Sequence, residues 1–304
     1  MEGIAQGSAS GECAMTADEP VSRHFVSQRL KLHYADWGNA GAPPLILVHG
    51  QRDHCRSWDW VARTFRHHFH VVAPDLRGHG DSAWSGGNYP MSTYVLDLAR
   101  FLDHLGTGQA TIIGHSLGGN IAVRFAGTFP ELVTRLVCIE GLGRPPAKQA
   151  ERDSRTIDER LRLWIAEQGT LLARRPRRYP TFEAAAQHMQ AANRHLSPDQ
   201  AHHLALHGAR RNEDGSWSWK FDPLVRSSLP EDLTSDEIRF LWSRVSAPTL
   251  LVYGRDSWAS NPAEDGRLAH FPNAELVMLD DAGHWAHHDR FHAFVAEVKR
   301  FLGP

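Results

Sequence analysis

The pattern of apolar positions divides the chain into short buried segments separated by stretches long enough for helices. Compact apolar runs occur at residues 45–48, 70–73, 110–113, 136–139, 249–253 and 276–279. Runs without polar alternation are typical of strands covered on both faces, as in a parallel sheet between two layers of helices. Residues 24–37 instead alternate, which predicts an antiparallel strand pair leading into that sheet.

The long interval between the runs at 136–139 and 249–253 breaks this rhythm and lacks β-type runs. Its composition predicts helices at 154–174, 181–195 and 197–209, with proline, serine and threonine as boundary signals. We therefore expect a core formed by 21–143 and 241–304, an inserted helical lid at 144–240 and a disordered tail at 1–20. Trp217, Trp219 and Phe221 are expected near the mouth of a site.

Composition narrows the classes of partner. The chain has 304 residues, 41% apolar content and a formal charge of −2. A near-neutral balance gives no overall attraction to nucleic acid or an anionic membrane, so small apolar substrates are expected. Three widely spaced cysteines predict no disulfide framework and favour a cytoplasmic location, and no run is apolar enough for a signal peptide or membrane span. The composition is also compatible with a homodimer.

The most informative motif is the pentapeptide Gly114-His115-Ser116-Leu117-Gly118, which directly follows the apolar run at 110–113. Residues 117–129 are predicted to form a helix, with small residues for close packing on a sheet. A G-x-S-x-G sequence between a strand and a helix is the pattern of a nucleophile elbow, a tight turn that exposes the serine hydroxyl. Acyl transfer is the chemistry that such a serine suits.

Further motifs occur in the order found in one large family: His49-Gly50, residues 75–82 (DLRGHGDS), the elbow, residues 254–258 (GRDSW) and residues 282–285 (AGHW). With them the chain resembles an α/β-hydrolase of the lidded esterase, lactonase and dehalogenase group. The resemblance implies an α/β fold with an eight-stranded, mostly parallel sheet, helices on both faces and the site at the carboxyl ends of the strands. Dehalogenases and epoxide hydrolases carry aspartate at the elbow, so Ser116 argues against both chemistries.

A serine nucleophile needs a base with a pKa near neutrality, which an imidazole supplies. Among 20 histidines, His284 is favoured because it follows the last predicted strand, in the order serine, acid, histidine. His115 is expected to point into packing, and His49 and His79 to organise loops through hydrogen bonds.

Two histidine clusters raise the question of a metal: His202, His203 and His207, and His287, His288 and His292. Neither cluster has the acidic residue of an H-E-x-x-H helix. Solvated histidines are therefore the favoured interpretation, and neither a metal nor a cofactor is expected.

The residue that orients the imidazole has two candidates. In the common family pattern the acid lies three residues beyond a glycine after the seventh strand, and counting from Gly254 reaches Ser257. Asp256 is one residue short of that place. Glu140, at the end of the strand after the elbow strand, matches the acid position of lactonases resembling those that open zearalenone. A carboxylate at the end of an apolar strand is costly unless it is paired, so Glu140 is favoured, with Asp256 as the fallback.

Backbone N–H groups of Gln51 and Leu117 are expected to form an oxyanion hole, although the Gln51 side chain can instead line the pocket. Five tryptophans in predicted loops or the lid are expected to wall an aromatic substrate pocket: Trp84, Trp217, Trp219, Trp258 and Trp285. The arginine-rich run at 174–178 can meet an acidic substrate or partner, but a solvated lid edge is the favoured interpretation.

The sequence therefore predicts a cofactor-free serine hydrolase that cleaves a carboxylic ester or lactone through an acyl-enzyme. Ser116 is the expected nucleophile, His284 the base and Glu140 the orienting acid. The alternative enzyme is a C–C hydrolase of vinylogous diketones, which shares fold and serine triad. The alternative outside enzymes is a ligand-binding protein that has kept the fold without turnover.

Overall fold

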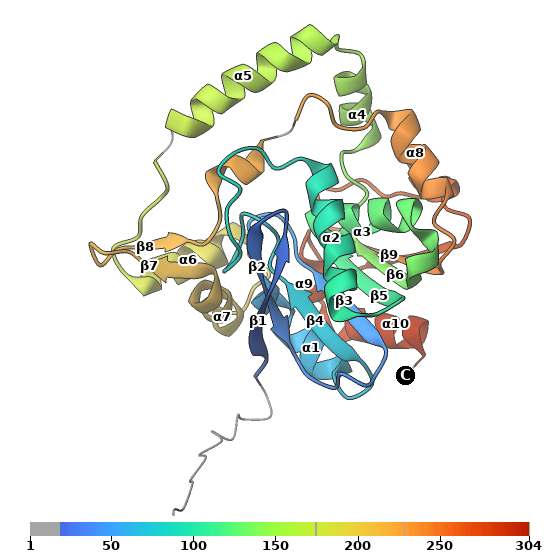
Figure 1. Ribbon diagram of the computed structural model, residues 1–304, viewed down its shortest axis with the longest axis horizontal. Coiled ribbons are helices and arrows are strands. Elements are labelled where there is room, and N and C mark those ends of the chain that lie inside the picture. Colours follow the sequence, from blue (N-terminus) through green and yellow to red (C-terminus); the bar gives the residue numbers. More distant parts are fainter. Residues whose placement is uncertain (1–18, 174, 228, 304) are drawn as a thin grey trace, which may run out of the picture.

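The computed structural model describes residues 19–173, 175–227 and 229–303 (Figure 1). The expected tail at 1–20 lies outside these residues apart from Glu19 and Pro20. Among the described residues no helix has both the length and the apolar character needed to cross a bilayer.

Within the described residues the centre of the molecule is an eight-stranded sheet with the order β1-β2-β4-β3-β5-β6-β9-β10. Within this sheet, only the pairs β1–β2 and β2–β4 are antiparallel. Every apolar run became a strand, and the alternating stretch became the pair β1–β2, as predicted. The bounds are β1 Val21–Ser27, β2 Leu30–Asp36, β3 Pro44–Val48, β4 His70–Pro74, β5 Ala110–His115, β6 Val133–Ile139, β9 Thr249–Gly254 and β10 Ala274–Leu279.

The sheet is covered on both faces because successive side chains of its strands point to opposite sides. On β3, Ile46 and Val48 belong to one apolar cluster, and Leu45 and Leu47 belong to the other. The helices α2 (Met91–Leu105), α3 (Leu117–Thr128) and α8 (Ser235–Ser243) contribute to the first cluster. The second receives η1 (Cys55–Trp58), α1 (Asp59–Phe65) and α10 (Phe291–Leu302). Because helices pack on both faces of the sheet, the sequences of its strands are continuous apolar runs.

The segment between β6 and β9 contains the three predicted helices, as α5 (Ile157–Ala173), α6 (Phe182–Ala192) and α7 (Pro198–Gly208). Thr181 and Ser197 cap α6 and α7 by accepting backbone hydrogen bonds through their hydroxyl oxygens. Helix α5 extends across the top of Figure 1, from α4 toward the side where α6, β7 and β8 lie.

This segment also contains two short strands, which its lack of β-type runs did not predict. β7 (Ala209–Arg211) and β8 (Trp217–Trp219) form an antiparallel pair, and the isolated bridge between Tyr179 and Trp217 extends it. Three-residue strands are too short to produce an alternating pattern. The remaining short elements are η2 Pro130–Leu132, α4 Pro146–Asp153, η3 Pro223–Arg226, η4 Arg267–His270 and α9 Ala286–Asp289.

Candidate active site

Ser116 stands alone between β5 and α3, in a backbone conformation that side-chain-bearing residues rarely adopt, with φ 52° and ψ −112°. Such strain persists where the surroundings over-determine it, and it is the hallmark of a nucleophile elbow. The flanking glycines are required for space. A Cβ on Gly114 would lie 2.5 Å from the Gly118 carbonyl oxygen, and a Cβ on Gly118 would lie 2.2 Å from that of Val48.

His284, in the loop after β10, connects Ser116 to a buried carboxylate. Its Nε2 lies 2.9 Å from Ser116 Oγ, and its Nδ1 lies 2.5 Å from Glu140 Oε2. Nδ1–H therefore donates to Glu140, which leaves Nε2 free to accept the serine proton. The Glu140 side chain has no solvent exposure, whereas that of His284 is 20% exposed. The ring is thus held in one orientation at the edge of accessible space.

Glu140 directly follows β6 and has a positive φ of 48°. Its Oε1 accepts from the Gly254 N–H at 2.8 Å, and its Oε2 accepts from the Ser257 hydroxyl at 2.6 Å. A buried carboxylate with these donors in addition to His284 is compensated for the loss of water. Ser257, at the place where the common family pattern has an acid, here supports the carboxylate of another strand.

Asp256 lies elsewhere. Its backbone N–H donates to Ala282 O at 2.9 Å, and its side chain lines a cavity wall near His284. Among the described residues, the carboxylate bonded to His284 is that of Glu140.

His115 supports the loop that carries His284. It is buried, and its Nε2–H donates to the backbone oxygen of His284 at 2.9 Å. Burial, with further contributions from neighbouring histidines, lowers the pKa of His115 well below its usual range, so this ring stays neutral. The loop-organising roles predicted for His49 and His79 are confirmed. His49 donates to Gly50 O and accepts from the Leu76 N–H, and His79 donates to Arg77 O.

The interpretation of the clustered histidines as solvated is wrong for His287 and His288, which are 1% and 6% exposed. Sequence reasoning also missed Asp59, which lies against the other cluster, with its Oδ2 3.1 Å from His203 Nε2. Ligand-type atoms of Asp59, His203 and His207 lie within 4.8 Å of one another. The guanidinium of Arg56 is bonded to the Asp59 carboxylate at 2.7 Å, where a cation would have to compete with it.

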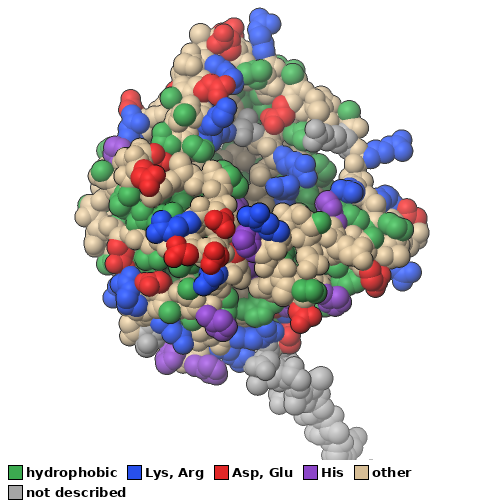
Figure 2. All heavy atoms as spheres, turned by 180° about the vertical axis from the view of Figure 1, so that it is seen from behind, with side chains coloured by type: hydrophobic (Ala, Val, Ile, Leu, Met, Phe, Trp, Pro, Cys, Tyr) green, Lys and Arg blue, Asp and Glu red, His purple; other side chains and the backbone are tan. Residues whose placement is uncertain are grey.

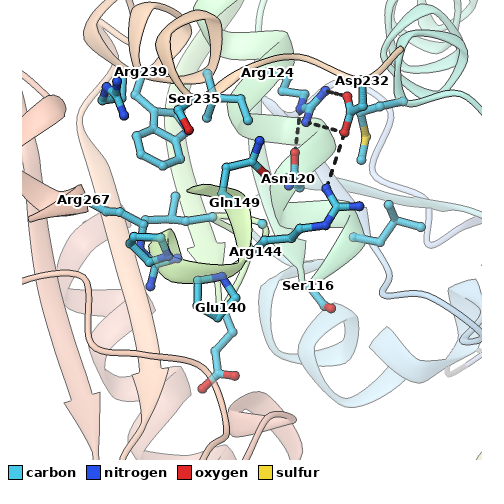
Figure 3. A pocket seen from close by; sticks show the side chains of 18 of the residues that line it. Ser116, Asn120, Arg124, Glu140, Arg144, Gln149, Asp232, Ser235, Arg239 and Arg267 are labelled. Carbon is cyan, nitrogen blue, oxygen red and sulfur yellow. Dashed lines mark hydrogen bonds and ion pairs between the residues drawn. The ribbon is translucent and has the colours of Figure 1, made fainter. Parts of the chain in front are cut away.

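Two cavities meet at Ser116, and both are also lined by Gln51 and Trp258. The α3 cavity, of about 590 Å³, extends along Leu117, Asn120 and Arg124 of α3. Figure 3 shows Ser116 and Glu140 at one end of it and Ser235 and Arg239 at the other. The α6 cavity, of about 990 Å³, extends under α6 and is also lined by His284.

The expected oxyanion donors lie beside Ser116 in the α3 cavity, with Leu117 at the first position of α3. The N-terminus of a helix favours developing negative charge. The side chain of Gln51 has a separate task, because its amide donates to Val225 O at 2.6 Å and so ties η3 to the loop after β3.

The predicted tryptophan wall is only partly assembled. Trp258 lines both cavities, with its ring 4.8 Å from that of His284, and Trp219 and Trp285 line the α6 cavity. Trp84 instead packs under Arg210, and Trp217 packs against Phe182. Neither of these two lines the described cavities at Ser116. A position in a predicted loop or in the lid does not specify the direction in which a side chain points.

Charged groups in the α3 cavity are largely paired. Arg124 contacts Asp232 at 2.6 Å and Asn120 at 2.7 Å, and Arg144 lies 3.9 Å from Asp232 (Figure 3). Arg267 contacts Asp265 at 2.8 Å. The remaining lining of the α3 cavity includes apolar side chains such as those of Ile238 and Trp242 in α8. The cavity can therefore accept an apolar group beside a fixed polar network.

The fold and the serine elbow define an α/β hydrolase. The model of the α/β hydrolase fold family matches residues 43–291, and the chain belongs to that family. It is similar to the esterase Rv0045c of Mycobacterium tuberculosis, with 30% identity over 275 residues that cover 88% of this chain and 84% of the esterase.

Solved structures show the same fold. A structure of the esterase Rv0045c from M. tuberculosis has a TM-score of 0.74 at 26% identity, covering 94% of this chain and 93% of that one. The thioesterase domain from the curacin biosynthetic pathway has a TM-score of 0.79 at 23% identity, covering 92% and 99% of the two chains. At that identity the second likeness concerns the fold alone.

Proposed function

We propose that the protein hydrolyses a carboxylic ester or a lactone through an acyl-enzyme formed on Ser116. One observation carries the proposal: the continuous hydrogen-bonded series from Ser116 Oγ through the His284 ring to the buried Glu140 carboxylate. An imidazole with one nitrogen bonded to a hydroxyl and the other to a carboxylate is the arrangement that activates a serine. The similarity to an esterase over most of both chains supports it.

In the first half-reaction His284 Nε2 takes the hydroxyl proton while Ser116 Oγ bonds to the ester carbonyl carbon. Negative charge then develops on the carbonyl oxygen, where the backbone N–H groups of Gln51 and Leu117 are the proposed donors. Glu140 stabilises the imidazolium. Collapse of the tetrahedral intermediate breaks the bond to the alcohol oxygen, which takes the proton from Nε2.

In the second half-reaction water replaces the alcohol. His284 Nε2 removes a proton from water as its oxygen bonds to the acyl carbon, and the returning proton restores the Ser116 hydroxyl. The products are a carboxylic acid and the regenerated enzyme. A lactone follows the same route, with acid and alcohol released as one molecule.

Substrate panels test the proposal. We expect hydrolysis of p-nitrophenyl butyrate and of a simple lactone, and a loss on the order of 10⁴-fold in kcat for Ser116→Ala. Cleavage of a vinylogous diketone, with no cleavage of p-nitrophenyl butyrate or the lactone, would favour C–C hydrolysis. Binding of these compounds without turnover of any would favour the non-catalytic ligand-binding interpretation.

A further inference from the structure

The α6 cavity has an unusual charge pattern where it opens around Ser116 and His284. Its lining includes five arginines, which come from the loop after β3, the stretch between α5 and α6, the turn after α6, and η3: Arg52, Arg175, Arg177, Arg194 and Arg226. Asp256 is the carboxylate among its lining residues. In Figure 2 the molecule is hollowed on its back face, and Lys and Arg side chains gather beside the hollow.

None of these arginines makes an ion pair with another described residue. Arg177 packs over the ring of Tyr179 and lies 3.5 Å from His188 Nδ1, and Arg226 packs over the ring of Phe221. Arg194 donates to His195 Nε2 at 3.4 Å. The α3 cavity differs, since Arg124 and Arg267 there are matched with aspartates. Among the described residues, the arginines without an ion-pair partner at these two cavities therefore line the α6 cavity.

Arg52, in the loop after β3, and Arg226, in η3, both line the cavity and are close enough to repel each other. Burial, and then the charge of Arg226, lower the pKa of Arg52. Isolated arginines on an open surface are solvated at little cost. Several that converge on one cavity concentrate a positive potential, which an entering anion relieves. Guanidinium groups bind carboxylate and phosphate oxygens through paired hydrogen bonds.

The position of His284 indicates which part of a substrate meets these arginines. The alcohol oxygen must reach His284 to receive its proton. His284 lines the α6 cavity, whereas Leu117, a proposed oxyanion donor, lines the α3 cavity. Although Gln51 lines both cavities, the positions of Leu117 and His284 favour the α3 cavity for the acyl chain and the α6 cavity for the alcohol portion.

We propose that the alcohol portion of the preferred substrate carries an anionic oxygen group, a carboxylate or a phosphate, bound by Arg52 and Arg226 in the α6 cavity. This inference rests on the ester hydrolysis proposed above. The corresponding substrates are acyl esters of alcohols that carry a carboxylate or a phosphate group. This class differs from the small apolar ester expected from composition.

The experiment compares butyrate esters that share one acyl group. Their alcohols are para-(hydroxymethyl)benzoate, its neutral carboxamide and para-(hydroxymethyl)phenyl phosphate, and kcat/KM is measured at low and at high salt. For the intact protein we expect kcat/KM of an anionic ester to exceed that of the neutral ester by about tenfold or more at low salt, and the ratio to shrink as salt screens the arginines. The benzoate and phosphate arms identify which oxyanion is preferred.

The double variant Arg52→Gln/Arg226→Gln should bring this ratio close to one. The matched control is Arg210→Gln, which removes an arginine that packs on Trp84 outside both cavities and should retain the ratio. Thermal melting establishes that each variant is folded. A ratio near one in the intact protein, or an unchanged ratio in the double variant, would overturn this inference while ester hydrolysis still stood. Hydrolysis of none of the esters would contradict the proposed function and this inference with it.

Discussion

At the scale of single residues, the carboxylate that orients the His284 ring is the most directly testable feature. Glu140 and Asp256 are alternatives in sequence, but in the structure only Glu140 contacts the His284 ring, at 2.5 Å. We expect Glu140→Gln to lower kcat by about 10³- to 10⁴-fold, because an amide neither fixes the required tautomer nor stabilises the imidazolium. Steady-state hydrolysis of a p-nitrophenyl ester measures this.

Asp256→Asn is the matched change, since it also replaces one carboxylate by an amide, at a residue that lines the α6 cavity together with His284. It should leave kcat within about twofold, as expected of a group that does not touch the reacting atoms. The opposite ranking of the two variants would transfer the role to Asp256.

The role of a single residue could be predicted from the sequence where its placement carries an energetic cost. Glu140 attracted attention because a charge after an apolar strand needs a partner. Ser257 gave no such signal, because a hydroxyl in a loop is inexpensive, and its hydrogen bond to Glu140 could be found only in the structure. The same is true of Asp59, whose contact with His203 joins segments 144 residues apart in the chain.

At the scale of elements, the turn from β5 into α3 depends on backbone contact that only glycine permits. Gly118→Ala would place a Cβ 2.2 Å from Val48 O and 2.6 Å from His49 O, neither of which can move without disturbing β3. We expect a loss of about 1–3 kcal/mol in the free energy of unfolding, together with reduced activity as Ser116 shifts. Urea unfolding measures the first effect.

Gly108→Ala is the control, because a Cβ there has nothing within 4 Å. It should change the free energy of unfolding by less than about 0.5 kcal/mol, as most surface substitutions do. Equal stability of the two variants would show that the backbone around Gly118 has room for a Cβ atom.

Elements differed in how well their sequences predicted them. The buried strands could be predicted from the sequence because helices cover both faces of the sheet. Side chains that point to either face are therefore apolar. Helices α6 and α7 were readable from their caps at Thr181 and Ser197. The strands β7 and β8 were not, since three residues carry too little periodicity and their pairing depends on contacts with Tyr179.

At the scale of the whole molecule, buried histidines make stability depend on pH. Burial lowers the pKa of His54 to about 4, and burial together with neighbouring histidines lowers the pKa values of His79 and His288 to about 3. The unfolded chain binds protons at these rings near pH 6.5, whereas the folded protein does not. Acidification below that value therefore favours unfolding, by up to ~1.4 kcal/mol per pH unit for each ring.

Asp53 acts in the opposite direction, because burial raises the pKa of its carboxyl to about 7 and the folded state takes up its proton first. The three histidines outweigh it, so the free energy of unfolding should fall by about 2 kcal/mol or more from about pH 7.5 to 5.5. Urea unfolding across this interval tests the sum. His288→Gln should flatten the profile, whereas the exposed His292→Gln should not. A profile that rises on acidification would contradict the assignment of these rings as buried and neutral.

If the Ser116 hydroxyl, activated by His284, forms a covalent bond to the substrate, a fluorophosphonate should label it, and peptide mass spectrometry locates the label. We expect one phosphonyl group on Ser116, no labelling of Ser116→Ala, and labelling of His284→Ala slowed by orders of magnitude. Label on a different residue, or an unchanged labelling rate in His284→Ala, would contradict this chemistry.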